Sequence, residues 1–183
     1  MKPILASASP RRKEYLKLIF EDFDIIPSTV DETLPKGISV KSAPEFLARL
    51  KALDIAKKHP ENLVIGADTC VILNNKIFGK PKSPQEAFLM LKKLSGKSHM
   101  VITGCALVKG DKIKTFSVTT TVKFFKLSDS EIKAYTATAE PYDKAGGYGI
   151  QSMGGLFVKG IKGDYLNVVG LPVPRLKKEI EKF

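Results

Sequence analysis

The sequence feature that most constrains the fold is the segment of residues 63–81, LVIGADTCVILNNKIFGKP. It opens with an apolar run that is typical of a strand buried on both faces, and the run is interrupted at Asp68. A second apolar run leads to Asn74 and Asn75, which tolerate positive φ and therefore close hairpins. We predict that Asp68 lies at the mouth of the buried strand and that the return strand brings Lys80 opposite it. The alternative interpretation is that Asp68 only caps a turn at the end of the strand.

Strand-like and helix-like segments alternate in the first part of the chain, and a hairpin-rich middle follows. No internal repeat, linker or low-complexity tract separates them, and 183 residues is an ordinary length for one domain. Alternation of this kind indicates helices packed on a sheet. We therefore predict a single α/β domain over residues 1–183, with a mixed sheet, flanking helices and two lobes around a cleft.

Several helices and strands can be placed from local patterns. Three serines are each followed, three residues later, by a glutamate, which is the pattern of a capping box: Ser42 with Glu45, Ser83 with Glu86, and Ser128 with Glu131. The buried face of the first of these helices is predicted to carry Phe46, Leu47, Leu50 and Leu53. Residues 100–108 and 112–125 predict two long strands, residues 165–169 a short strand, and Pro174 the start of a last helix.

The composition excludes several classes of protein. No apolar run approaches the roughly 20 residues that a membrane-spanning helix needs, and the N-terminus lacks the apolar core of a signal peptide. These features predict a cytoplasmic protein without membrane contact. Cys70 and Cys105 are the only cysteines, and both lie in apolar strand-like runs. We expect two reduced core residues rather than a disulfide or a metal-binding pair.

The charge of the chain is strongly positive, with a formal net charge of +11. Its lysines are spread along the whole chain instead of forming a tail or a stripe, and aromatic residues make up only 8% of the chain. This distribution favours a solvated basic surface over a nucleic-acid interface. A non-catalytic nucleic-acid-binding protein or cell-division regulator stays open as an alternative, and its binding would weaken steeply with salt.

A phosphate site is predicted near the N-terminus. Ser9 and Pro10 indicate the start of a helix, with serine as the N-cap and proline in the first helical position. Arg11 and Arg12 then fall in the first turn, where the positive end of the helix dipole disfavours cations. A bound anion would remove this conflict, because helix N-termini and hydroxyl groups donate hydrogen bonds to phosphate. We therefore expect Ser7, Ser9, Arg11 and Arg12 to bind phosphate, the alternative being two solvent-facing arginines.

The remaining polar residues narrow the chemistry further. His59 and His99 are the only histidines, and neither is paired in sequence with a nucleophile, so a catalytic triad is not expected. The ligand count also excludes a zinc site. What remains suits metal-assisted hydrolysis of a polyphosphate, because carboxylates and phosphate oxygens are the ligands that Mg²⁺ prefers. The donors are Ser7, Ser9, Arg11, Arg12, Lys51 and Lys80, and the carboxylates are Glu32 and Asp68.

Seven motifs, in the same order along the chain, resemble the Maf family of nucleotide pyrophosphatases. They are LASASPRRKEYL (5–16), VDETLPKG (30–37), GADT (66–69), GKP (79–81), LSGKSHMVITG (94–104), YDKAGGYGIQ (142–151) and VVGLP (168–172). The resemblance implies an ITPase-like fold in a cytoplasmic enzyme that often forms homodimers. It also implies hydrolysis of nucleoside triphosphates between the α and β phosphates, giving a monophosphate and pyrophosphate, with a divalent cation such as Mg²⁺ or Mn²⁺.

Carried over by position, the resemblance implies roles for individual residues. Asp68 matches the proton acceptor, and Arg11, Thr69 and Gln151 match positions tied to base selectivity. The other matched site positions are Ser7, Ser9, Arg12, Glu32, Lys51 and Lys80. The loop YDKAGGYGIQ resembles the branch that acts on dTTP and UTP, with modified pyrimidine triphosphates as further candidates. A glutamine amide is complementary to the N3–H and O4 edge of uracil or thymine. Methylated guanine triphosphate is the alternative substrate within the family.

Overall fold

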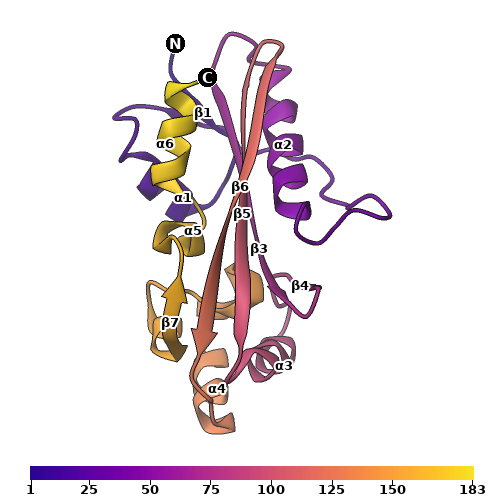
Figure 1. The fold of residues 1–183 in the computed structure, drawn as a ribbon, viewed down its shortest axis with the longest axis vertical. Helices are drawn as coiled ribbons and strands as arrows, with labels where there is room; N and C mark the ends of the chain where they lie inside the picture. The colour runs from indigo at the N-terminus through magenta and orange to yellow at the C-terminus, as the bar shows by residue number, and fades with distance from the viewer. The chain divides into compact units, whose positions relative to one another are not determined.

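A mixed sheet of seven strands forms the frame of the protein in the computed structural model, which describes residues 1–183 (Figure 1). The strands are β1 (Ile4–Leu5), β2 (Asp24–Ile25), β3 (Val64–Leu73), β4 (Lys76–Phe78), β5 (Ser98–Lys109), β6 (Lys112–Phe124) and β7 (Val158–Lys162). The α-helices are α1 (Pro10–Leu16), α2 (Ala43–Ala56), α3 (Pro84–Leu94), α4 (Asp129–Thr136), α5 (Tyr165–Val169) and α6 (Val173–Glu181). Short 3₁₀ turns follow α4, namely η1 (Glu140–Asp143), η2 (Ala145–Gly147) and η3 (Met153–Phe157).

The order of hydrogen-bonded strands is β2-β1-β3-β5-β6-β7, and β4 pairs with β3. β1 runs parallel to β2 and β3, whereas the β3–β4 and β6–β7 pairs are antiparallel. The predicted α/β class with a mixed sheet is therefore confirmed. The β3–β4 hairpin is also as predicted: Asn74 and Asn75 have φ of 50° and 58°, and a type I′ turn needs positive φ at both central residues.

The chain divides into two compact units, which agrees with the predicted lobes, while the cleft stays a prediction. The first unit comprises Met1–Thr69, Thr103–Val118 and Gly170–Phe183. The second comprises Cys70–Ile102 and Thr119–Val169. The boundaries fall inside β3, β5 and β6, so these three strands supply residues to both units.

In the first unit, α2 packs on the sheet through small residues, in a cluster with side chains of β1, β3 and β5. A Cβ on Gly66 would lie only 2.2 Å from the carbonyl oxygen of Ala48, and one on Gly104 only 2.3 Å from the backbone nitrogen of Glu45. Glycine at both positions therefore lets the helix backbone approach the strands. The predicted buried face was wrong in consequence: Leu47 is buried, whereas Phe46, Leu50 and Leu53 are partly exposed.

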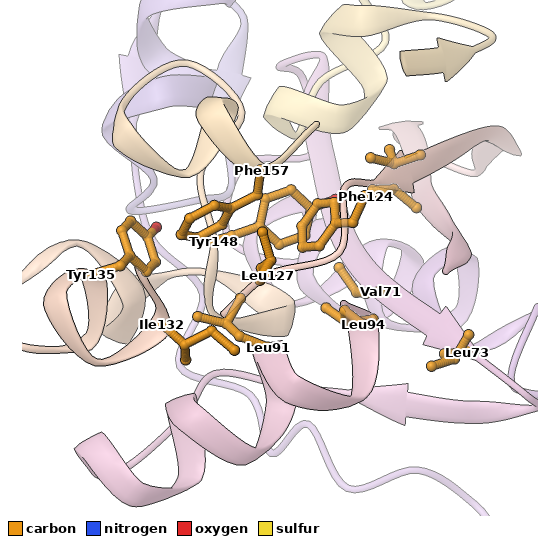
Figure 2. Close-up of a cluster of buried hydrophobic side chains, with 12 residues drawn as sticks. Val71, Leu73, Leu91, Leu94, Phe124, Leu127, Ile132, Tyr135, Tyr148 and Phe157 are labelled. Carbon is orange, nitrogen blue, oxygen red and sulfur yellow. The ribbon is translucent and has the colours of Figure 1, made fainter. Parts of the chain in front are cut away.

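The core of the second unit is a cluster of buried apolar side chains, shown in Figure 2. Phe124, Tyr148 and Phe157 lie close together in it, with the Phe124 ring centroid 4.7 Å from that of Tyr148 and 6.0 Å from that of Phe157. Edge-to-face ring pairs of this kind add to the free energy of burial. Leu91 of α3 and Ile132 of α4 belong to the same cluster, where the two helices pack together. The core thus anchors both ends of the segment of residues 148–157.

Tertiary contacts changed some of the predicted helix caps. Ser128 and Glu131 form the predicted capping box at α4. At α2, however, Ser42 makes no side-chain cap, and Glu45 instead accepts a hydrogen bond of 2.6 Å from the hydroxyl of Thr115. At α3 the Ser83 side chain caps the helix, but Glu86 accepts a hydrogen bond from the Lys82 amide and not from that of Ser83. Only half of the predicted box therefore forms.

The prediction of a strand over residues 165–169 was wrong, because these residues form α5. The Asp164 carboxylate accepts a hydrogen bond of 2.8 Å from the Leu166 amide, which favours a helical start. Within the helix, the buried Asn167 amide donates to the carbonyl of Val101 and to the hydroxyl of Thr120, each at 3.0 Å. The long-range amide contacts therefore override the strand propensity of the local sequence.

Cys70 and Cys105 are buried free cysteines, as predicted. Burial raises the pKa of the Cys105 thiol to about 12, so this side chain behaves as a small core residue. The helices of this structure are too short or too polar for any of them to cross a bilayer.

Candidate active site

Lys51 joins the two carboxylates that the sequence analysis selected. Its Nζ lies 2.7 Å from Oδ1 of Asp68 and 2.9 Å from Oε2 of Glu32. The side chains of Lys51 and Asp68 are 12% and 13% exposed, whereas that of Glu32 is 53% exposed. Loss of the lysine would therefore remove a counter-ion from the poorly solvated carboxylate of Asp68. The structure thus brings three of the predicted site residues into one ion-paired group.

The close packing of α2 on β3 explains how Lys51 reaches Asp68. Asp68 lies two residues after Gly66 on β3, so both positions lie on the same face of the strand. Gly66 faces Ala48 and Ala52 of α2, which flank Lys51 in sequence. The sequence-based placement of Asp68 at the mouth of the strand was wrong, because β3 continues through it to Leu73. Asp68 and Thr69 interrupt the apolar pattern of the sequence, but the strand continues through them.

The loop that carries Glu32 is held by a residue that the sequence analysis missed. Asp54, one turn after Lys51 on α2, accepts hydrogen bonds of 2.7 Å from the Ser28 hydroxyl and 3.3 Å from the Thr29 amide. The Ser28 hydrogen bond is the main cause that lowers the pKa of Asp54, against the opposing effect of burial. Lys51 and Asp54 therefore connect the same loop to α2 at two points. A carboxylate three residues after a lysine on a helix was the only available signal in the sequence.

Arg12 is held by oxygen atoms that carry no formal charge. Its Nε donates to the carbonyl of Gly170 at 2.9 Å, its Nη1 to the Ser7 hydroxyl at 3.1 Å, and its Nη2 to the Thr69 hydroxyl at 3.0 Å. These bonds use three of the five N–H groups of a guanidinium, so two remain for an anion. Burial is the largest effect on the pKa of Arg12 and lowers it, while the Asp68 charge acts in the opposite direction. The guanidinium remains a cation, because arginine side chains are not deprotonated in proteins.

The neighbours of Arg12 include further residues of the predicted site. Ser9 is the N-cap of α1, as predicted, and its hydroxyl accepts a hydrogen bond of 3.4 Å from the Arg12 amide. Arg11 precedes Arg12 in the first turn of α1 and is partly buried. Thr69 has a hydroxyl contact of 2.9 Å with Thr103, a fully buried residue that the sequence analysis did not select. Thr103 stands as a polar residue in an apolar strand, and that contrast could have identified it.

Lys80 and Gln151 belong to the second unit. Both side chains are exposed, and the segments that carry them are joined: the Gly146 amide donates to the carbonyl of Gly79 at 2.9 Å. Gly146 has a φ of 72°, and a Cβ there would lie 2.9 Å from the Val71 side chain. The hairpin that ends at Lys80 and the glycine-rich loop that leads to Gln151 are therefore packed as neighbours within this unit.

The carboxylate pair can be tested as a metal site from its geometry. Glu32 and Asp68 converge on one ammonium nitrogen, so a position where a cation is stabilised already exists. No group of three or more histidine, cysteine, aspartate or glutamate side chains is arranged to hold a metal ion. Mg²⁺ commonly binds one or two carboxylates together with substrate phosphate oxygens. The donor set therefore fits a cation that shares its ligands with a polyphosphate.

Comparisons with known proteins agree with the family that the order of motifs indicates. A family model described as Maf-like protein matches residues 2–183. This chain belongs to the Maf family. Curated relatives named dTTP/UTP pyrophosphatase include proteins of Halalkalibacterium halodurans, 48% identical over 99% of this chain and 96% of the relative, and of Thermosipho africanus, 51% identical over 96% of this chain and 90% of the relative. A relative of the same name from Bacillus cytotoxicus is 49% identical over 100% of this chain and 95% of the relative.

Two solved structures are also similar to this Maf protein. They are titled as Ham1 proteins, from Staphylococcus aureus and Coxiella burnetii, and are 21% and 16% identical in sequence. Each similarity covers 68% of this chain, and 72% and 73% of the respective neighbour, with TM-scores of 0.48 and 0.49. The family assignment is based on the family model and the curated relatives.

Proposed function

We propose that this Maf protein hydrolyses dTTP and UTP to the nucleoside monophosphate and pyrophosphate. The observation that carries this proposal is that Asp68 and Glu32 both form ion pairs with Lys51, in the same compact unit as the Arg12 guanidinium. Cations placed beside a water-activating carboxylate are what hydrolysis of a polyphosphate needs. The names of relatives at 48% and 51% identity support the choice of these two nucleotides.

Asp68 is the proposed general base. Its carboxylate would orient the attacking water and accept a proton from it as the α–β anhydride bond breaks and pyrophosphate leaves. Lys51 holds this carboxylate in one orientation through the 2.7 Å contact. When a polyphosphate enters, the same ammonium can move to a phosphate oxygen, and the Asp68 oxygen is then released to contact water.

The phosphate chain is proposed to bind to Arg12, Ser7 and Lys51, with Ser9, Arg11 and Lys80 as further contacts. Arg12 is the strongest candidate, because three neutral partners fix its orientation and two N–H groups remain. A bidentate guanidinium contact matches the spacing of two phosphate oxygens. The hydroxyl of Ser9 is occupied as the cap of α1, so its contribution would be to hold the turn that carries Arg12.

Mg²⁺ or Mn²⁺ is proposed to bind to Glu32 and Asp68 together with substrate oxygens. When bound, such a cation neutralises phosphate charge and lowers the pKa of a water molecule. The role of Asp54 follows from this arrangement, because its hydrogen bonds hold the loop from which the exposed Glu32 reaches Lys51.

Base selectivity is proposed to involve Gln151, Thr69 and Arg11. A glutamine amide offers a donor and an acceptor, which is complementary to the N3–H and O4 edge of a pyrimidine. The position of Gln151 at the end of a glycine-rich loop suits a contact of this kind, since backbone without side chains can approach a ligand closely. Modified pyrimidine triphosphates are further candidate substrates for the same reason.

A panel of triphosphates with Mg²⁺ or Mn²⁺ tests the activity. The expected products are UMP or dTMP with pyrophosphate, identified by chromatography and a pyrophosphate assay. Nucleoside diphosphate and orthophosphate as products would refute the proposal. Faster turnover of methylated guanine triphosphate would assign the protein to the other substrate class of the family.

Asp68→Asn tests the role of the general base. General-base catalysis contributes about 100-fold to 10,000-fold, so we expect kcat to fall by at least about 100-fold while nucleotide binding is retained. Asp24→Asn is a matched control, because Asp24 is an exposed strand carboxylate in the same unit. A kcat of Asp68→Asn near that of the wild-type protein would mean that another group accepts the proton.

We further propose that residues 1–183 act as one domain, because β3, β5 and β6 run unbroken through both units. The homodimer and the cytoplasmic location stay predictions, as does the expectation that the protein makes no specific contact with nucleic acid.

A further inference from the structure

The glycine-rich loop before Gln151 is closed by one carboxylate oxygen. Oε1 of Glu140 accepts hydrogen bonds from the Tyr135 hydroxyl at 2.9 Å, the Ser152 hydroxyl at 2.6 Å and the Gly154 amide at 3.1 Å. Two of these donors, Ser152 and Gly154, lie one and three residues after Gln151 in the chain. Glu140 therefore connects the residues after Gln151 to the start of the loop.

The residues before Gln151 are held by the same group. The Tyr135 hydroxyl accepts a hydrogen bond of 3.3 Å from the Gly149 amide while it donates to Glu140. Tyr135 is 2% exposed and belongs to the core of the second unit, where its ring packs on Phe157 with centroids 4.9 Å apart (Figure 2). Both sides of Gln151 are thereby tied to a residue of α4 whose ring is fixed by the core.

The loop also leaves little room for another conformation. A Cβ on Gly154 would lie 2.8 Å from the Gly149 carbonyl oxygen and 2.9 Å from the Tyr135 hydroxyl. A Cβ on Gly155 would lie 2.5 Å from the carbonyl oxygen of Ile150. The two limbs of the loop are in backbone contact, which side chains at these positions would prevent.

The ionised state of Glu140 suits this arrangement. Burial acts to raise the pKa of Glu140, but the hydrogen bonds from Ser152, Gly154 and Tyr135 outweigh it, and the pKa is lowered. The Lys144 ammonium acts in the same direction and donates to the Glu140 backbone carbonyl at 2.8 Å. A negatively charged acceptor makes stronger hydrogen bonds than a neutral one. The Glu140 carboxylate therefore holds the loop more firmly than the amide of a glutamine at this position would.

We propose that Glu140, together with Tyr135, is a positioning residue that sets the location of Gln151 and thereby the selectivity for the base. Neither residue needs to touch the nucleotide for this role. The inference depends on the proposed function for its consequence in catalysis, but its structural part concerns the loop alone and can be tested without a substrate.

Glu140→Gln and Glu140→Ala are the test variants, and Glu131→Gln is the matched control. Glu131 lies in the same unit and also accepts two hydrogen bonds, of 2.7 and 2.6 Å from the amide and hydroxyl of Ser128, but it is not bonded to the loop. The first measurement is the ratio of kcat/KM for dTTP to that for a purine triphosphate. A group displaced by about 1 Å can cost on the order of 100-fold, so we expect the ratio to fall by about 10-fold to 100-fold in Glu140→Ala and less in Glu140→Gln.

Tyr135→Phe separates positioning from general stability. It keeps the ring in the core and removes only the hydroxyl that connects Glu140 to Gly149. We expect a smaller fall in the selectivity ratio than in Glu140→Ala. The effects of Tyr135→Phe and Glu140→Gln should not be additive, because the two residues share one hydrogen bond. A KM for dTTP that rises more than kcat falls is the expected signature of a displaced base-reading group.

Hydrogen exchange of the segment of residues 145–157, measured by mass spectrometry, is the second readout. Faster exchange there in Glu140→Gln, with no change in Glu131→Gln, is expected whether or not the protein hydrolyses dTTP. Unchanged exchange would overturn the inference by itself, and so would faster exchange with an unchanged selectivity ratio. If wild-type protein fails to release pyrophosphate from any triphosphate, the proposed function falls while the exchange result still decides the structural part.

Discussion

His99 gives a prediction that can be worked out in numbers. It is 2% exposed in the core of the second unit, where its Nε2 lies 2.7 Å from the Tyr148 hydroxyl and its Nδ1 has no hydrogen-bond partner. Its ring packs against Phe124 at 4.9 Å and Tyr148 at 5.5 Å between centroids. Burial among these rings lowers the pKa of His99 from 6.5 to about 4, because the charged imidazolium would lose its hydration.

The sign and size of the effect on stability follow from that pKa. Between pH 6.5 and pH 4 the unfolded chain binds a proton at this histidine and the folded protein does not, so acid favours unfolding. Stability is therefore full above pH 6.5 and falls as the pH is lowered toward 4. At about 1.4 kcal/mol for each pH unit, the loss across this window is about 3 kcal/mol.

Urea unfolding at pH 7, 6, 5 and 4 provides the assay, with His99→Gln compared with the wild-type protein. Carboxylates also titrate in this range, so the informative quantity is the difference in unfolding free energy between the two proteins at each pH. That difference should move in favour of His99→Gln by about 3 kcal/mol between pH 7 and pH 4. His59→Gln is the matched control, because it removes the only other histidine and keeps His99. A difference that stays constant over this range would refute the reasoning.

Two further substitutions test how α2 positions the site. In Gly66→Ala the new Cβ would lie 2.2 Å from the Ala48 carbonyl oxygen, so α2 must move by about 1 Å. We expect the free energy of unfolding to fall by about 1–3 kcal/mol. We also expect a lower kcat, because α2 carries Lys51. Gly160→Ala is the control, because a Cβ there has no atom within 4 Å, and it should change neither the unfolding free energy nor kcat. Equal unfolding free energies of the two variants in urea would contradict the packing argument. Asp54→Ala frees the loop that carries Glu32 and should lower kcat/KM by about tenfold with a small change in Tm. Wild-type kinetics in that variant would show that the loop needs no such anchor.

The members of the candidate site were largely predictable, whereas their contacts were not. Side-chain chemistry together with the resemblance to the Maf family selects Lys51, Glu32 and Asp68 from 30 basic and 19 acidic side chains. It does not reveal that one ammonium bonds to both carboxylates. It also misses Asp54, because a carboxylate on an amphipathic helix usually faces solvent.

The sequence by itself determined several of the features that depend on neighbours within a few residues, although the capping boxes predicted at α2 and α3 did not form in full. The N-cap at Ser9, the turn at Asn74 and Asn75, and the capping box of Ser128 and Glu131 all form as predicted, because the interacting groups are separated by at most a few peptide bonds. Such contacts have a small cost of loop closure and are set by side-chain and backbone preferences.

Only the tertiary structure decided the features that join distant segments. The Arg12 guanidinium bonds to the Gly170 carbonyl across 158 residues, and the buried face of α2 depends on glycines in two strands. Asp68 lies inside a continuous strand, because pairing along the sheet extends past the polar residues. The physical reason is the same in each case: these partners meet only when the sheet assembles, and backbone packing and long-range hydrogen bonds then outweigh local propensity.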